Sequence, residues 1–315
     1  MQNYPKFLRD FLIYLTTIKG KSKRTREEYE YDLVLFFRFH LCMQQDLPLE
    51  TLEQVSIRDI AADDVRDITL EDLYVFLEYC EEVRQNSASS RARKVATLRA
   101  FFKYMRGKRK LIDDNPAEEL ESPKQVKRRP IYLKVDEAQS LLQATKSGSH
   151  YERNHCIITF FLHLGLRVSE LCNLNMSSLQ EDQLRIIGKG NKERIVFCND
   201  ICLEALHTYK TVRTPYKGDE VDEPMFTSQK GTRLTRQRIA KMLKAVSDSA
   251  ELTKGGITPH KLRHTSATLM YQAGADIRSL QHILGHSSVA TTQIYTHIED
   301  DSIRDVLAKN PLNKK

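Results

Sequence analysis

The sequence predicts a mainly α-helical chain of two domains, with a small β-sheet in the second domain only. Its 315 residues are enough for two domains that each have a core. Apolar residues recur at helical spacing through residues 1–112, whereas two β-branched runs around a short turn occur once, at 184–197. Residues 113–130 hold three prolines and several basic side chains, which is typical of a linker.

The helices of the first part are marked by capping sequences and apolar stripes. Thr25 opens the capping-box sequence TREE, and Thr69 opens TLED. A third pattern covers 89–110, where one face is apolar and the remaining surface carries lysine and arginine. The apolar positions of the three patterns are Tyr29, Leu33, Phe36, Phe37, Leu73, Phe76, Leu77, Val95, Leu98, Phe102 and Met105.

Charge is distributed very unevenly in the first part. The net charge of the chain is +7, but residues 44–82 hold twelve acidic and two basic side chains, and residues 84–110 hold ten basic and no acidic ones. A polyanion is the expected partner, and nucleic acid is favoured over a membrane because no basic amphipathic anchor is present. The alternative is a solvated basic face, but such a face usually mixes charges of both signs.

Six basic residues are the candidates for contacts to double-stranded DNA. Four lie on the expected helix at 89–110 and two in the linker, where they would follow the phosphate backbone. They are Arg91, Arg93, Lys94, Arg99, Lys127 and Arg128.

Composition sets further expectations about the environment of the chain. No apolar run approaches the roughly 18 residues that span a bilayer, and MQNYPKFLRD lacks the apolar core of a secretory signal. We therefore expect no membrane association and a cytoplasmic, nucleoid-associated location. The six cysteines form no CxxC pair and are expected to be free thiols.

The second part alternates expected helices with one hairpin. LRIIGKGNKERIVF forms the hairpin, with the turn at KGNK, residues 189–192. Further helices are expected after Asp200 and after Thr235. The remaining expected helical segments are 135–144, 153–167, 257–274, 275–285 and 287–297.

Polar residues recur at the ends of these elements. Arg167 follows an apolar helix and has Glu170 three residues later, which by itself is most often a surface ion pair. Lys189 lies at the hairpin tip and does not fit a nucleotide-binding P-loop. His260 and Arg263 share one helix face because they are three residues apart.

Two alternatives concern the histidines and the tyrosine of this part. His260 and His264 have zinc-site spacing, but Lys261 stands where the HExxH motif needs glutamate. Tyr295, nine residues after His286, would ordinarily be a half-buried amphipathic residue.

The order of these residues resembles the tyrosine recombinase, or phage integrase, family, most closely its bacterial Xer type. The resemblance rests on GLRVSEL, GKGNKER, TPHKLRHTSAT, LGHSS and TTQIYTH. It implies a two-domain DNA clamp: a helical, SAM-like core-binding domain at 1–112, the basic linker at 113–130 and an α+β catalytic domain at 131–298. A tail at 299–315 would then dock on a neighbouring protomer.

The resemblance also implies an activity and a set of site residues. The chain would cleave and rejoin DNA strands through a 3′-phosphotyrosine, as a homo-tetramer on its recombination site or a hetero-tetramer with a second recombinase. Glu170 would be a supporting carboxylate for Arg167 or a histidine, and no metal, ATP or other cofactor would be needed. The implied catalytic residues are Arg167, Lys189, His260, Arg263, His286 and the nucleophile Tyr295.

The main alternative from another class is a non-catalytic regulator in which HKLRHTSATLMYQAGADIRSLQHILG is a helix-turn-helix. That alternative explains the charge but gives Lys189 and Tyr295 no role. A metal-dependent hydrolase is less favoured because no carboxylate cluster accompanies the histidines, and a type IB topoisomerase, which shares the chemistry, is less favoured because the arrangement is Xer-like and the chain is short.

Overall fold

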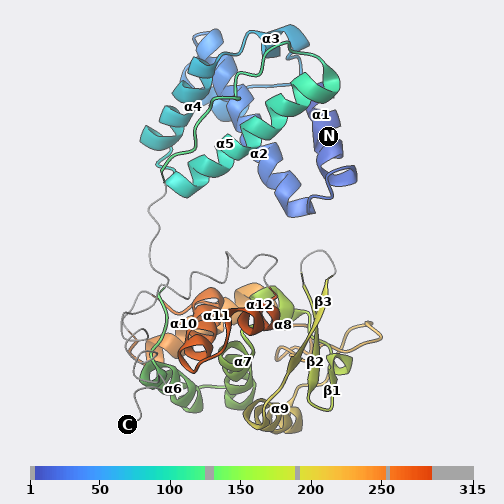
Figure 1. Cartoon of the computed structure of the whole chain (residues 1–315), viewed down its shortest axis with the longest axis vertical. Coiled ribbons are helices and arrows are strands. Elements are labelled where there is room, and N and C mark those ends of the chain that lie inside the picture. The colour runs from blue at the N-terminus through green and yellow to red at the C-terminus, as the bar shows by residue number, and fades with distance from the viewer. Residues whose placement is uncertain (1–3, 125–130, 189–191, 253–255, 286–315) are drawn as a thin grey trace, which may run out of the picture. The chain divides into compact units, whose positions relative to one another are not determined.

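The computed structural model describes residues 4–124, 131–188, 192–252 and 256–285. It divides the chain into two compact units, Met1–Lys127 and Arg128–Lys315, each with its own core (Figure 1). The predicted fold class is confirmed: the described chain is mostly helical, and its one three-stranded sheet lies in the second unit. No helix in the described segments is long and apolar enough to cross a membrane.

Helices α1 to α5 form the first unit. Their bounds are α1 Lys6–Thr17, α2 Lys23–Gln44, α3 Ala62–Arg66, α4 Leu70–Glu82 and α5 Ala88–Tyr104, with a 3-10 turn at Leu49–Gln54 and a π-helical turn at Met105–Arg109. Thr69 forms the predicted capping box with Asp72. The prediction that Thr25 caps a helix is wrong, because α2 begins at Lys23 and its N-cap is Ser22, whose hydroxyl accepts the Thr25 N–H at 3.1 Å.

Phenylalanines dominate the core of the first unit. Phe36 packs edge-on against Phe76 with ring centroids 5.2 Å apart, and Phe37 packs edge-on against Phe101 at 5.6 Å. Each such edge-to-face pair stabilises the core by about 0.5–1.5 kcal/mol beyond the contribution of the buried area. The predicted apolar stripes of α2, α4 and α5 all face this core, so α5 can expose only its polar side.

The segment after α5 belongs in part to the first unit. Ile112, Ala117 and Leu120 are buried in its core, and the Asn115 side chain accepts the backbone N–H of Ala117 at 3.1 Å. Residues 113–120 are therefore packed chain, although the sequence assigned them to the linker. The boundary between the two units, at 127/128, falls within the expected linker range.

Helices α6 to α12 and the sheet form the second unit. Their bounds are α6 Val135–Ala144, α7 Tyr151–Leu164, α8 Val168–Cys172, α9 Asp200–Val212, α10 Arg236–Ser249, α11 Pro259–Gln272 and α12 Ile277–Leu284, with 3-10 turns at Thr145–Ser147 and Met176–Ser178. Helix α7 packs against both α9 and α11, and α12 packs against α11 and β3. These contacts bring the ends of α7, α8 and α12 together near the sheet (Figure 1).

The sheet is an antiparallel meander in the order β1-β2-β3. Its strands are β1 Leu179–Gln180, β2 Gln183–Ile187 and β3 Glu193–Phe197, and Ile186 pairs with Arg194. The predicted hairpin is confirmed in its strands, whereas its tip at 189–191 lies outside the described residues. Alternation along β3 turns Arg194 and Val196 toward the unit and leaves Ile195 and Phe197 exposed.

Candidate active site

Gly165 sets the position of Arg167. The apolar helix ends at Leu164, and Gly165 follows in the left-handed region at φ +58°. A Cβ at Gly165 would lie 2.7 Å from Leu284 Cδ2, so this close approach of α12 requires glycine. The expected helix at 153–167 therefore stops short, and Arg167 becomes the residue that precedes α8.

Glu170 is a buried carboxylate that gathers cations from three elements. Its residue is 3% exposed. Arg167 donates twice, from its backbone N–H to Oε2 at 2.8 Å and from Nη1 to Oε1 at 2.7 Å. Arg194 of β3 donates from Nη1 at 2.8 Å and Nη2 at 2.9 Å, one bond to each oxygen. Arg263 of α11 completes the group, with Nη1 3.8 Å from Oε2.

These cations keep Glu170 ionised. Burial alone would raise the pKa of its carboxyl group, but hydrogen bonds and charge from Arg194, followed by hydrogen bonds from Arg167, lower that pKa to about 2. A carboxylate that stays charged inside the protein can hold several guanidinium groups in fixed directions.

Arg167 and Arg263 converge on one oxygen atom. Arg263, only 4% exposed, donates from Nη1 to the carbonyl of Gly165 at 2.6 Å and from Nη2 to the carbonyl of Leu284 at 2.5 Å. Arg167 Nη1 lies 3.4 Å from the same Leu284 oxygen, and its Nη2 donates to the carbonyl of Gly285 at 3.1 Å. Two guanidinium groups from distant parts of the sequence therefore share one acceptor.

His260 lies one helical turn before His264, and the two imidazoles are in contact. Their Nε2 atoms are 2.9 Å apart, so one ring donates to the other. Burial, then the charges of Arg263 and Arg167, lower the pKa of His260. Burial, then His260 and Arg263, lower the pKa of His264 to about 4. The charges of Arg167 and Arg263 both act on His260, so the three groups belong to one site.

Three of the six predicted catalytic residues lie outside the described residues: Lys189, His286 and Tyr295. Their neighbours in the chain are described. Gly188, before Lys189, closes the hairpin by donating to the carbonyl of Lys192 at 2.8 Å. Gly285, before His286, ends α12 at φ +63° and accepts from Arg167. In the described segments no three His, Cys, Asp or Glu side chains are grouped to hold a metal ion.

Arg194 is a site residue that the sequence reasoning missed. Besides Glu170, its Nε donates to the carbonyl of Ile283 at 2.9 Å, and its side chain is 9% exposed. A signal was available: the period of two along 193–197 puts Arg194 on the inward face with Val196, and an inward arginine needs a buried acceptor.

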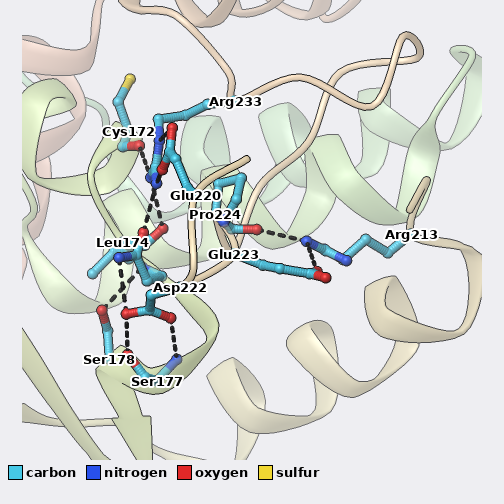
Figure 2. Close-up of polar contacts among 11 residues, drawn as sticks. Cys172, Leu174, Ser177, Ser178, Arg213, Glu220, Asp222, Glu223, Pro224 and Arg233 are labelled. Carbon is cyan, nitrogen blue, oxygen red and sulfur yellow. Dashed lines mark hydrogen bonds and ion pairs between the residues drawn. The ribbon is translucent and has the colours of Figure 1, made fainter. Parts of the chain in front are cut away.

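A second polar network fixes the other end of α8, as Figure 2 shows. Arg233 donates to the carbonyls of Cys172 at 3.2 Å and Leu174 at 3.4 Å and also pairs with Glu220. Asp222 accepts from Asn175 at 3.0 Å. The short helix that follows Arg167 is thus held at its C-terminal end by side chains of the 213–235 segment.

The predicted DNA contacts of the first unit separate into exposed and occupied side chains. Lys94 is 2% exposed and pairs with the buried carboxylate of Asp32 at 2.8 Å, which also takes Arg93. Asp32 holds the Lys94 ammonium inside the unit, so the expectation for Lys94 is corrected: it is a core residue. Arg91 pairs with Glu81, whereas Arg99 is exposed.

The remaining basic side chains of 84–110 also divide into those with an ion-pair partner and those that are exposed. Acidic side chains from other segments neutralise several of them, so the absence of acids within 84–110 overstated the free charge. Arg84 pairs with Glu53, Arg106 with Glu118 and Arg109 with Asp10. Arg99, Lys103, Lys108 and Lys110 are exposed and have no ion-pair partner among the described residues. Lys127 and Arg128 lie outside the described residues.

Comparison with known proteins agrees with this architecture. Residues 132–302 match the phage integrase family, and residues 8–108 match the phage integrase N-terminal SAM-like domain. The chain is 43% identical to "Tyrosine recombinase XerC" of Caldanaerobacter subterraneus subsp. tengcongensis, over 99% of this chain and 88% of the relative.

Two solved structures share the fold. One is the XerH site-specific recombinase bound to palindromic difH substrate, with a TM-score of 0.68, 21% identity and coverage of 96% of this chain and 94% of the other. The second is a lambda integrase tetramer bound to a Holliday junction, with a TM-score of 0.68, 19% identity and coverage of 92% and 76%.

The helix-turn-helix regulator is the less supported alternative, because the relatives are recombinases and the similarity extends over nearly the whole chain. The matched catalytic region holds Arg167 and Arg263 on a shared acceptor, and the N-terminal match covers the helical unit. The chain belongs to the phage integrase family of tyrosine recombinases, and it is similar to members of the Xer type.

Proposed function

We propose that the chain is a site-specific recombinase that cuts double-stranded DNA by attack of Tyr295 on a phosphodiester and rejoins the strands by the reverse reaction. One observation carries the proposal: the guanidinium groups of Arg167 and Arg263 meet at a single oxygen, the carbonyl of Leu284. A non-bridging phosphate oxygen could take the place of that carbonyl oxygen and would be bound more strongly, because it is charged.

The chemistry explains why two arginines are needed. A phosphodiester repels a nucleophile, and its pentacoordinate transition state gathers further negative charge on the non-bridging oxygens. Arg167 and Arg263 remain charged at all relevant pH values and present planar forks of donors. Glu170 holds both of them, so little reorganisation is required when the charge develops.

The other roles follow from what each group can donate or accept. The Tyr295 phenol supplies the attacking oxygen, and a positive surrounding favours its ionised form. Lys189 would protonate the leaving 5′-oxygen, an effect typically worth about 10² to 10⁴ in rate. His260, in the field of both arginines, would act as base or orient Tyr295, and His286 would add a hydrogen bond to the phosphate.

The covalent link removes the need for an energy source. The phosphodiester bond energy is retained in the 3′-phosphotyrosine, so a 5′-hydroxyl from a second strand can reverse the attack. The reaction on this account needs neither ATP nor a metal ion.

Assembly on DNA is the final part of the proposal. Arg99, with Lys127 and Arg128, would contact the phosphate backbone, and four protomers would exchange strands, with the tail at 299–315 docked on a neighbour. The lambda integrase tetramer on a Holliday junction supports this arrangement by analogy of fold. A second recombinase could replace two of the four protomers.

A nicked DNA site tests the proposal. Cleavage near a nick releases a short fragment, so the 5′-hydroxyl is lost and the covalent adduct accumulates. We expect a protease-sensitive, detergent-resistant adduct with the wild type and none with Tyr295→Phe, although both bind the site. If both bind and neither forms the adduct, the chain is a DNA-binding regulator.

A further inference from the structure

Arg194 lies where the segments that carry the proposed catalytic groups meet. Its Nη1 and Nη2 bind the two oxygens of Glu170, and its Nε binds the carbonyl of Ile283 in the last turn of α12. All three guanidinium nitrogens of Arg194 therefore donate hydrogen bonds to protein oxygens, and the side chain is 9% exposed. An arginine with this many fixed bonds has little freedom, so it can fix the elements that it joins.

Two glycines show how closely the catalytic segments approach Arg194. A Cβ at Gly285 would lie 2.8 Å from Arg194 Nη1, and a Cβ at Gly188 would lie 3.9 Å from the same atom and 3.7 Å from Glu170 Oε1. Gly285 immediately precedes His286, and Gly188 immediately precedes Lys189. The backbone of Gly285 and that of Gly188 therefore both lie close to the Arg194–Glu170 ion pair.

We infer that Arg194 is a positioning residue for DNA cleavage: through Glu170 it orients Arg167, and through its bond to the Ile283 carbonyl and its proximity to Gly188 and Gly285 it sets the points from which Lys189 and His286 extend. This inference rests on the proposed function. In this inference Arg194 holds protein groups and does not bind the phosphate: both Nη atoms bind Glu170, and Nε binds the Ile283 carbonyl.

The matched control is another arginine of the same sheet. Arg185 on β2 pairs with Glu193 at 3.7 Å, and both side chains are more than half exposed. Arg185→Gln removes the same charge from the same sheet without touching Glu170. Arg194→Gln removes the two bonds to Glu170, and Arg194→Lys keeps the charge but loses the planar fork.

The test measures three quantities for these variants on the nicked site: the single-turnover rate of adduct formation at saturating protein, the DNA dissociation constant and the thermal unfolding midpoint. A displacement of reacting groups by about 1 Å can cost about 10² in rate, so we expect Arg194→Gln to cleave about 10²-fold more slowly at unchanged DNA affinity. Arg194→Lys should fall between this variant and wild type, and Arg185→Gln should match wild type.

A pH profile distinguishes positioning from general damage. The charged groups around Glu170 are Arg167, Arg194 and Arg263. Without Arg194, burial moves the pKa of Glu170 upward, so the carboxylate is protonated as the pH falls and loses its hold on Arg167. As the pH is lowered from neutral, the ratio of the Arg194→Gln cleavage rate to the wild-type rate should therefore decrease. The ratio of the Arg185→Gln rate to the wild-type rate should stay constant.

The outcomes separate the inference from the proposed function. A wild-type rate for Arg194→Gln, or a loss of rate matched by an equal loss of DNA affinity, would overturn the role of Arg194 alone. If Arg194→Gln does not fold, a wild-type rate for Arg194→Lys has the same meaning. Absence of the adduct with the wild type would overturn the proposed function and the positioning role together.

Discussion

Each unit buries one carboxylate that binds cations from distant segments, and the two clusters differ in what else their cations bind. Asp32 of the first unit is 1% exposed and holds Arg93, Lys94 and the Thr97 hydroxyl, with the Lys94 ammonium 2% exposed. In the second unit Glu170 is similarly buried, and the side chain of its partner Arg167 is 37% exposed, against 32% for Arg93.

The comparison shows that a buried carboxylate can serve two purposes. Around Asp32 the Lys94 ammonium is enclosed, so the cluster joins α2 to α5 through a buried ion pair, although the Arg93 side chain is 32% exposed. Around Glu170 the carboxylate holds an arginine that still faces outward, at a place where a carbonyl oxygen already occupies the shared acceptor position. The shared acceptor distinguishes the two clusters, because Arg93 and Arg167 are similarly exposed, at 32% and 37%.

The largest expected effect is on stability in the first unit. Asp32→Ala leaves Lys94 buried without its carboxylate, which should cost about 3–5 kcal/mol in the free energy of unfolding. Denaturant unfolding followed by circular dichroism measures this. Glu27→Gln, which removes the exposed pair with Lys23, is the control and should cost about 0.5 kcal/mol or less. If both variants lowered the free energy of unfolding equally, the Asp32 cluster would not be a main source of stability in the first unit.

The next effect concerns catalysis in the second unit. Arg263→Lys keeps the charge but cannot bind the Gly165 carbonyl and a phosphate oxygen with one planar fork. Loss of one such donor typically costs about 10² to 10³ in rate, and DNA affinity should change little. Single-turnover cleavage of the nicked site, with binding measured in parallel, gives both values. A wild-type cleavage rate would remove Arg263 from the proposed clamp.

The pH dependence of stability should follow Glu170. Its folded pKa of about 2 lies below the ordinary value of 4.5. The unfolded chain therefore binds this proton more readily, and the contribution of about 3 kcal/mol is present above pH 4.5 and lost as the pH falls toward 2. Unfolding free energies measured between pH 3 and 7 should fall less steeply at low pH for Glu170→Gln than for wild type. Parallel curves would contradict the pKa shift.

The smallest effect compares two cations of α5. Arg99 is exposed, so Arg99→Gln should weaken DNA binding modestly and reduce the slope of log affinity against log salt by about 1. Lys94→Met should leave that slope unchanged in the folded protein, because Lys94 faces Asp32. Titration of a labelled site at several salt concentrations measures both. The reverse result would place Lys94 at the DNA and Arg99 in solvent.

Much of the fold was predictable because its signals are local. The apolar stripes of α2, α4 and α5 and the two β-branched runs of the hairpin depend on residues close in sequence, and the structure places them as expected. The end of α7 is an exception: the expected helix at 153–167 stops at Leu164, before Gly165, which is a typical helix terminator.

The partners of charged residues were not predictable, because they come from elsewhere in the chain. Lys94 was grouped with the DNA contacts on the charge of its neighbours, but its partner Asp32 lies on another helix. Glu170 binds Arg167, as expected, but nothing in the sequence indicates that Arg194 on a strand also binds both of its oxygens. No spacing rule along the sequence connects such pairs.

The claim that Arg167 and Arg263 clamp the non-bridging oxygens of a phosphate can be tested by changing the DNA and the protein together. The measurement is the single-turnover cleavage rate of wild type and Arg263→Ala on a nicked site whose scissile phosphate is either normal or a neutral methylphosphonate. If Arg263 acts on that charge, Arg263→Ala should be much less harmful on the neutral linkage than on the normal one. An equal loss of rate on both substrates would contradict the clamp.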